Sequence, residues 1–401
     1  MADGFPALDF RAFHREELPR RLARGWGRMA APAARSLGAL AFRLPSGEAY
    51  AYRPDGDAIR VVEGDAGAET VVALDHESWE GLVHDLESAP GLLYAGRATR
   101  VRGDLMRFVG WEPSLRAMFH GIPIYDPERA ELRGRDGERL DPTRGFRPDD
   151  PREEMADFLD AAGYLLVKGV VDAGELAALR AGAEELRRRA APGDKLSWWG
   201  RNRAGDEVLC RVIHAGTLPV FRALHGDRRI RALASLARGG LQPRSPERPN
   251  GVTVVWKNPE MVEGLSDLPW HRDCGMGGHA VMCPTMVMSL YLEPATRETG
   301  ELRFLPGSWR CTHGFAEATD PAAPEGVAVA AEAGDVTLHY GDGMHAAPPP
   351  TGARGPYRSS VLIGFARPGA RHHRGEDHYN DVLLQRDDGQ VPHLARLARE
   401  E

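Results

Sequence analysis

Short hydrophobic segments follow one another at close intervals in the second half of the chain. They are rich in Val, Leu, Tyr and Phe, and Gly- and Pro-containing turns separate them. This pattern is typical of strands in an all-β barrel or jelly roll. From Val252 onward the segments are VTVVW, TMVMSLYLE, ELRFLP, DVTLHY and SSVLIGF.

Two segments ahead of the predicted barrel have the composition of amphipathic helices. Residues 152–164 (REEMADFLDAAGY) and 172–189 (DAGELAALRAGAEELRRR) are rich in residues that favour helices. The strand-like run LLVKGVV at 165–171 lies between them. We therefore expect a barrel with flanking helices.

The first part of the chain predicts a smaller α+β unit. The turn PDGD joins two strand-like runs, and hydrophobic residues at helical spacing follow behind Asp75 or Ser78 as helix N-cap. The predicted strands span residues 40–52, 58–63 and 70–74, and the predicted helices span 76–87 and 103–119.

A charged stretch rich in Gly and Pro, from Asp126 to Pro151, separates the two patterns. It has almost no hydrophobic periodicity and cannot bury a face. We expect a first domain over 1–125, a linker over 126–151, a barrel domain over 152–401, and independent folding of the two domains.

Composition and charge narrow the class of protein. A chain that is 42% hydrophobic is not predominantly disordered, and a net charge of -7 leaves no positive excess for nucleic acid. No hydrophobic run is long enough to span a membrane. Four cysteines are too few for a disulfide scaffold, so we expect a cytoplasmic protein of unknown oligomeric state. The cysteines are Cys210, Cys274, Cys283 and Cys311.

Candidate metal ligands lie next to two of the predicted strands. His271 and Asp273 occur in PWHRDCG, where residues i and i+2 of an extended chain point to one side. His345 follows a later strand, and His339 is a competing candidate in the same segment. Two imidazoles and one carboxylate are the ligand set of non-haem Fe(II) oxygenases. A zinc or manganese enzyme of the cupin kind is the alternative.

A single arginine stands at the start of the last predicted strand. Arg358 opens the run RSSVLIGF, and an arginine inside a barrel is costly unless it meets an anion. Its planar guanidinium matches a carboxylate. We therefore expect Arg358 to bind an acidic ligand.

These motifs together resemble the phytanoyl-CoA dioxygenase family of iron- and 2-oxoglutarate-dependent oxygenases. The resemblance covers residues 152–370 and rests on DAAGYLLVKGVVDAGELAAL, WHRD, MSLYLEPATRETGELRFLPGSWR and GDVTLHYGDGMHAAPPPTGARGPYRSSVLIGF. It implies a double-stranded β-helix (a jelly-roll, cupin-like fold) and O2 as co-substrate. It also implies Fe(II) held by His271, Asp273 and His345, and 2-oxoglutarate whose distal carboxylate meets Arg358.

The resemblance also ranks the competing residues. His345 keeps the family's interval from Gly334-Asp335, so it is preferred to His339 as the distal ligand. The family often has serine where this chain has Ala347, and Ser360 could supply the missing hydroxyl. The long interval after His345 makes Arg354 the runner-up to Arg358 for the carboxylate of 2-oxoglutarate.

The first domain resembles a second family. Its strand hairpin, its helix and the sequence VRGDLMRFVGWEPSLRAMFHGIPIYDP are similar to sterol-carrier-protein-2-like domains, over residues 10–125. The resemblance implies a small α/β sandwich with an apolar tunnel for a lipid or another hydrophobic molecule.

The expected activity is hydroxylation of a hydrophobic or carrier-bound small molecule, in lipid or secondary metabolism, with release of succinate and CO2. Asp273 leaves no room for a halide ligand, which disfavours halogenation, while desaturation, epimerisation and cyclisation stay open. The hypothesis from a different functional class is a binding protein for hydrophobic ligands whose barrel has no catalytic activity. The stretch SWWGRNRAGDEVLCRV is either a substrate wall or a packed loop; its candidate substrate residues are Trp198, Trp199, Arg201 and Arg211.

Overall fold

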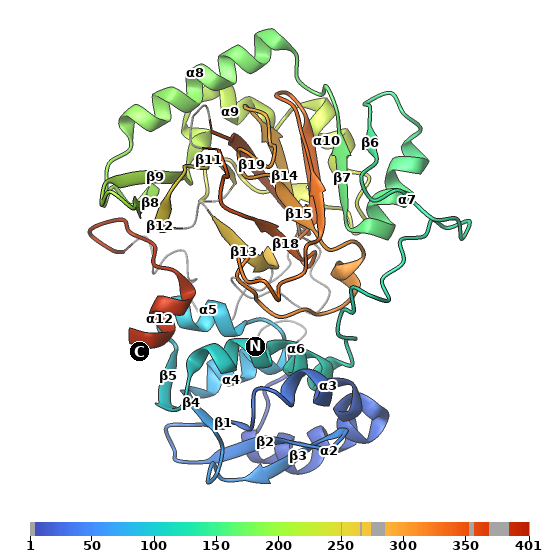
Figure 1. Ribbon diagram of the computed structural model, residues 1–401, viewed down its shortest axis with the longest axis vertical. Helices are drawn as coiled ribbons and strands as arrows, with labels where there is room; N and C mark the ends of the chain where they lie inside the picture. Colours follow the sequence, from blue (N-terminus) through green and yellow to red (C-terminus); the bar gives the residue numbers. More distant parts are fainter. Residues whose placement is uncertain are drawn as a thin grey trace.

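The computed structural model describes residues 5–249, 251–264, 267–273, 285–352, 357–368 and 385–400. The N-terminal α/β unit, blue to cyan in Figure 1, lies beneath a larger barrel drawn in green to orange. Helices α4, α5 and α6 lie between the N-terminal sheet and the barrel (Figure 1). Among the described residues, no helix combines the length and hydrophobicity needed to span a bilayer.

The N-terminal unit is built on a five-stranded sheet in the order β3-β2-β1-β4-β5. The predicted hairpin is confirmed, since Asp55 pairs with Ala58 around Gly56. The run predicted as one strand over 40–52 forms two strands, because the chain turns at Gly47, where φ is 87°. The strands are β1 (Leu40–Arg43), β2 (Ala49–Asp55), β3 (Ala58–Glu63), β4 (Thr70–Leu74) and β5 (Ala98–Arg102).

Helices cover one face of this sheet. Asp75 caps α4 by accepting from the Ser78 N–H, as predicted. The helical segment over Phe10–Ala34, helix α5 and strand β5 were not predicted. The helices are α1 (Phe10–Ala12), α2 (Leu18–Arg21), α3 (Gly27–Ala34), α4 (His76–Val83), α5 (Ala89–Tyr94) and α6 (Leu105–His120), with π-helical turns at Phe13–Glu17 and Leu22–Trp26.

The turn that leads into α6 requires a glycine. Gly103 has φ of 81°, and a Cβ there would overlap with the carbonyl oxygen of Glu69. Asp104 then caps α6 by accepting from the Met106 N–H.

We expect Gly103→Ala to lower the free energy of unfolding by roughly 3 kcal/mol, because it adds a steric clash to the left-handed backbone cost. Gly56→Ala is the matched control, since Gly56 has φ of 58° and open space around its Cβ position. It should cost only about 1 kcal/mol. Chemical denaturation measures both, and equal costs would contradict the close approach at Gly103.

The barrel consists of two facing sheets. The larger has the order β12-β8-β9-β11-β19-β14-β17-β7-β6, with β10 beside β19, and the smaller has the order β13-β18-β15-β16. The larger sheet contains β6 (Gly145–Phe146), β7 (Tyr164–Val167), β8 (Ser197–Asn202), β9 (Glu207–Val212), β10 (Gln242–Pro243), β11 (Val252–Trp256), β12 (Met261–Glu263), β14 (Thr285–Tyr291), β17 (Val336–Tyr340) and β19 (Ser359–Ala366). The smaller contains β13 (Leu268–His271), β15 (Leu302–Phe304), β16 (Val327–Val329) and β18 (His345–Ala347).

The two predicted helices flank the larger sheet. Gly163, with φ of 84°, ends the first, and a capping box between Asp172 and Glu175 begins the second. Their buried faces join the barrel core through residues such as Phe158 and Leu179. The helices of this part are α7 (Arg152–Ala162), α8 (Ala173–Arg189), α9 (Pro219–Leu224) and α10 (Arg228–Ala234).

The two parts of the chain share packed surfaces. Within the segment predicted as a linker, Gly145–Phe146 pairs with β7, and Leu132 and Leu140 pack against the barrel core. The C-terminal helix α12 (Leu394–Glu400) packs instead against α5 and α6. The N-terminal hydrophobic core also includes Trp198, Ile213, Val391, Leu394 and Ala398. The hydrophobic core of the N-terminal unit, distinct from that of the barrel, is therefore completed by residues from the second part of the chain.

Candidate metal centre

Two histidines face each other across neighbouring strands of the smaller sheet. His271 is the last residue of β13 and His345 is the first of β18, and the two are direct partners in the strand register. Residues directly opposite each other in an antiparallel pair place their side chains on one face. The ring centroids accordingly lie 4.3 Å apart.

Asp273 completes this cluster two residues beyond His271. Its Oδ1 lies 3.7 Å from Nε2 of His271 and 3.8 Å from Nε2 of His345. One ligand atom from each of the three residues lies within 4.8 Å of the others. The three side chains thus converge on one point.

Backbone carbonyls orient both imidazoles. Nδ1 of His271 donates to Pro269 O at 2.8 Å, and Nδ1 of His345 donates to Gly343 O at 3.0 Å. Because a carbonyl only accepts, each Nδ1 carries the proton. In the neutral rings, each Nε2 then presents a lone pair toward Asp273, as a metal ligand must.

The electrostatics of the cluster favour the ligating protonation states. Burial lowers the pKa of His345 well below its usual range, and the neighbouring His271 and His339 lower it further. Desolvation would raise the pKa of Asp273, but His345, His271 and His339 outweigh it and hold this pKa well below its usual range. At neutral pH the cluster therefore offers a neutral His345 and a carboxylate.

His339, the competing candidate, lies in the opposite sheet. It belongs to β17, and its Nε2 is hydrogen-bonded to Oδ2 of Asp273 at 3.1 Å. His271 and His345 approach the other oxygen of this carboxylate. His339 is thus placed to orient Asp273, a contact that the sequence reasoning did not anticipate.

Arg358 lies just ahead of β19 and is only 5% exposed. Its Nη1 is buried and has no hydrogen-bond partner within the described part of the chain. Burial lowers the pKa of this guanidinium, while Tyr291 and Asp267 oppose the shift. A buried guanidinium with a free N–H group is poised for an anionic ligand.

Polar residues lie on β19 and on the neighbouring strands β14 and β17. Ser360 is buried and pairs with Tyr291 in the strand register, and the Tyr291 hydroxyl is hydrogen-bonded to Thr337 at 3.1 Å. Tyr291 and Thr337 were not predicted as site residues. The runner-up Arg354 lies outside the described residues.

Lys257 is a second buried cation that the sequence analysis missed. Its backbone N–H donates to Arg358 O at 2.8 Å, and its Nζ donates to Ala347 O and pairs with Asp267 at 2.9 Å. Burial lowers the pKa of Lys257 to about 8, with Asp267 opposing. Lys257 thus lies between Arg358 and the position where the family often has serine.

The predicted substrate residues lie on the β8–β9 hairpin. Trp198 is buried in the N-terminal core, with the Arg211 guanidinium 4.8 Å from the centre of its ring. Trp199 donates to Ser197 Oγ at 2.8 Å. Arg201 lines a cleft of about 570 Å³ whose described walls do not include the histidine–aspartate cluster. Their role in substrate binding stays a prediction.

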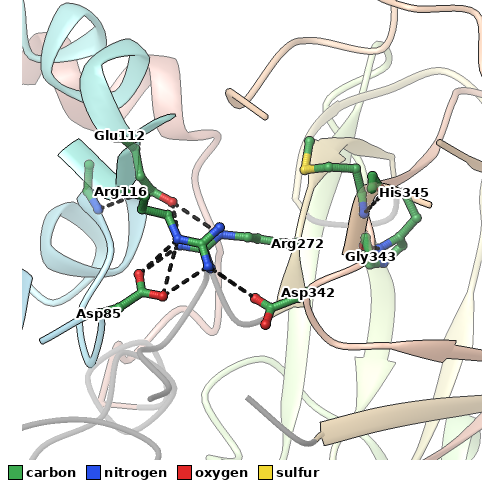
Figure 2. A network of polar contacts seen from close by, with 10 residues as sticks. Asp85, Glu112, Arg116, Arg272, Asp342, Gly343 and His345 are labelled. Atoms are coloured by element: carbon green, nitrogen blue, oxygen red, sulfur yellow. Dashed lines mark hydrogen bonds and ion pairs between the residues drawn. The ribbon is translucent and has the colours of Figure 1, made fainter. Parts of the chain in front are cut away.

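An ion network surrounds Arg272, which lies between His271 and Asp273 in the sequence. Arg272 donates from Nη2 to Glu112 at 2.8 Å and from Nη1 to Asp342 at 3.0 Å, and it pairs with Asp85 at 3.4 Å. Arg116 also binds Asp85, at 2.9 Å. Figure 2 shows Arg272 reaching from the barrel toward the N-terminal unit, with His345 on the barrel side.

A cavity of about 20 Å³ adjoins the cluster at the same junction. His271, His313, Phe315 and Met344 line it from the barrel, and Pro90, Val109 and Glu112 line it from α5 and α6. His313, for which no role was predicted, lies on this wall. The N-terminal unit therefore forms part of the surroundings of His271.

Comparison with known proteins agrees with this geometry. Residues 159–358 match the family model "Phytanoyl-CoA dioxygenase (PhyH)". A search of curated proteins finds no match. The matched residues include the two histidines and the aspartate of the cluster. Residues 159–358, just under half of the chain, are thus similar to the phytanoyl-CoA dioxygenase family, and the chain is an iron(II)- and 2-oxoglutarate-dependent oxidoreductase.

Several solved structures are similar to the chain. AviO1 from Streptomyces viridochromogenes Tue57 is 25% identical, with 55% of this chain and 96% of that chain covered and a TM-score of 0.43. EctD from S. alaskensis, with 2-oxoglutarate and 5-hydroxyectoine, is 23% identical over 61% and 86%, with a TM-score of 0.44. HygX from Streptomyces hygroscopicus, with nickel and 2-oxoglutarate, is 20% identical over 54% and 87%, with a TM-score of 0.40.

Proposed function

We propose that His271, Asp273 and His345 hold the iron of a 2-oxoglutarate-dependent hydroxylase. The observation that carries this proposal is the convergence of two Nε2 atoms and a carboxylate oxygen within 4.8 Å, with both Nδ1 atoms bound to carbonyls. Such a set fits Fe(II) and leaves positions for other ligands. Bound iron, with 2-oxoglutarate and O2, supplies the oxidant that attacks a C–H bond, and succinate and CO2 are released.

We propose that Arg358 binds the distal carboxylate of 2-oxoglutarate. Its buried Nη1 with no described partner supports this role. Ser360 lies two residues further along the chain, so in extended backbone it points to the same side and can add a hydroxyl. Lys257 lies beside this position, with its charge paired to Asp267.

The proposed substrate is a hydrophobic or carrier-bound small molecule. Val109, Phe315 and Met344 form an apolar wall of the small cavity next to His271, which Glu112, Arg272 and His313 also line. Such a wall positions an apolar C–H group and keeps water from the oxidant. Hydroxylation is the proposed outcome, and desaturation, epimerisation and cyclisation are the alternatives for the same oxidant.

We further propose that the N-terminal unit is related to sterol-carrier-protein-2-like domains. The confirmed hairpin and the Gly103-Asp104 turn into α6 support this relation. Aromatic side chains such as Phe42, Tyr52, Phe108 and Phe119 occupy the space between its sheet and helices. Lipid binding would therefore require these rings to move.

The testing experiment uses the full chain, stripped of metal and supplied with 2-oxoglutarate in air. We expect slow release of succinate on addition of Fe(II), even without the substrate, and none with Zn(II) or Mn(II). Succinate is measured by mass spectrometry. No succinate with any metal would favour a silent barrel, and turnover of a substrate without 2-oxoglutarate would favour the zinc or manganese enzyme.

A further inference from the structure

The residue between the first two ligands binds the N-terminal unit. Arg272 follows His271 and precedes Asp273, and its guanidinium is only 5% exposed. Water cannot satisfy its N–H groups at that depth, so they must find acceptors within the protein. Nε and Nη2 both donate to Oε1 of Glu112, at 3.3 and 2.8 Å, and Glu112 belongs to α6.

The same guanidinium also reaches the segment that carries the third ligand. Nη1 donates to Asp342 at 3.0 Å, and Asp342 lies three residues before His345, beside the Gly343 carbonyl that orients this histidine. Arg272 therefore joins the two segments that supply all three ligands. A displacement of this side chain would disturb both segments.

The N-terminal unit supplies two of the three carboxylates that hold Arg272. Three buried carboxylates, from Asp85, Glu112 and Asp342, face the two guanidinium groups of Arg116 and Arg272. Glu112 is held in turn by the Ala89 N–H at the start of α5, at 2.9 Å. Removing one partner of such a buried set leaves an uncompensated charge. Separation of the N-terminal unit from the barrel therefore has a high free-energy cost.

We infer that the N-terminal unit is an integral part of the metal centre and acts through Arg272 as a positioning residue. The docked helices α5 and α6 hold the Arg272 guanidinium in place. Arg272 in turn positions its sequence neighbours His271 and Asp273. It also positions Asp342, which lies close to His345 in the sequence. The N-terminal unit thus sets the affinity and geometry of the metal site from outside the ligand set. This inference rests on the proposed metal-binding role of the three residues.

The test changes Glu112, which supplies no ligand atom. Glu112→Gln keeps the shape of the side chain and removes the charge that holds Arg272. Outer partners that orient metal ligands commonly contribute 10–100-fold to metal affinity, so we expect roughly tenfold weaker Co(II) binding. We also expect a changed Co(II) ligand-field absorption spectrum, because that spectrum reports coordination geometry.

The matched control is Glu80→Gln in the same domain. Glu80 is 5% exposed and accepts from the Leu8 N–H at 2.7 Å, a contact within the N-terminal unit. The Glu80→Gln substitution should leave the Co(II) affinity and the Co(II) absorption spectrum unchanged. If Glu112→Gln fails to fold, Glu112→Asp retains the charge on a shorter side chain and should give an intermediate loss of affinity.

Wild-type affinity and spectrum in a folded Glu112→Gln protein would overturn the inference and leave the proposed function standing. Equal losses in the Glu80 and Glu112 variants would also overturn it, since they would indicate general destabilisation. A wild-type protein that binds no Co(II) would overturn the proposed function and this inference together.

Discussion

His345→Ala is expected to reduce iron-dependent succinate release to background and to abolish tight metal binding, while the fold survives. His345 lies at the start of β18 with Nδ1 bound to the Gly343 carbonyl, so only Nε2 faces Asp273 and His271. Alanine removes this lone pair and leaves two ligands. Metal content by mass spectrometry and succinate release measure the loss, and circular dichroism checks the fold.

His339→Ala is the control for this prediction. His339 binds the second oxygen of Asp273 but lies outside the converging set of ligand atoms. We expect its loss to weaken metal binding only about 10-fold, as for other residues that orient a ligand. A His345→Ala protein that keeps wild-type activity, together with an inactive His339→Ala protein, would show that the distal ligand is His339.

Arg358→Ala is expected to raise the 2-oxoglutarate concentration needed for half-maximal turnover by about 100-fold or more, since losing one partner of a buried charge pair costs several kcal/mol. The guanidinium is buried and its Nη1 has no described partner. Metal affinity should stay near wild type, because Arg358 is not among the converging ligands. Succinate release against 2-oxoglutarate concentration gives the first quantity, and metal titration gives the second.

Two further variants make this prediction specific. Arg358→Lys restores the charge without the planar fork, so it should recover only part of the affinity. Arg354→Ala should change little. If Arg354→Ala raised the 2-oxoglutarate requirement and Arg358→Ala did not, the loop before β19 would hold the co-substrate.

The barrel could be predicted because its strands are separate and hydrophobic. The runs at 252–256, 335–340 and 359–365 became β11, β17 and β19 with little change in bounds. The spacing of His271 and Asp273 also predicted that their side chains lie close together, because a histidine and an aspartate two residues apart can converge where a strand ends. Asp75, one of the two residues predicted as N-cap, likewise marked where α4 begins.

The β8–β9 hairpin was missed because its sequence does not alternate. SWWGRN places Gly, Arg and Asn among its aromatic residues, and the strand is kept in place by pairing with Glu207–Val212 and by contact with the N-terminal core. Those contacts come from distant parts of the chain. No local pattern could indicate them.

The ion network was missed for a similar reason. Glu112 and Asp85 are 160 and 187 residues away from Arg272 in sequence, and each occurs in a stretch that reads as a solvated helix surface. Asp85 also adopts a positive φ of 54° just after α4, which helical spacing does not anticipate. Only the docking of α5 and α6 on the barrel brings these charges together.

An anaerobic titration of the metal-free protein with Fe(II), in the presence of 2-oxoglutarate, tests whether His271, Asp273 and His345 hold iron together with the co-substrate. It follows the visible charge-transfer band that appears when the co-substrate chelates iron, and it needs no knowledge of the substrate. We expect a band that saturates at one Fe(II) per chain and is absent from His271→Ala. A wild-type protein without the band, or a His271→Ala protein with a full band, would contradict this expectation.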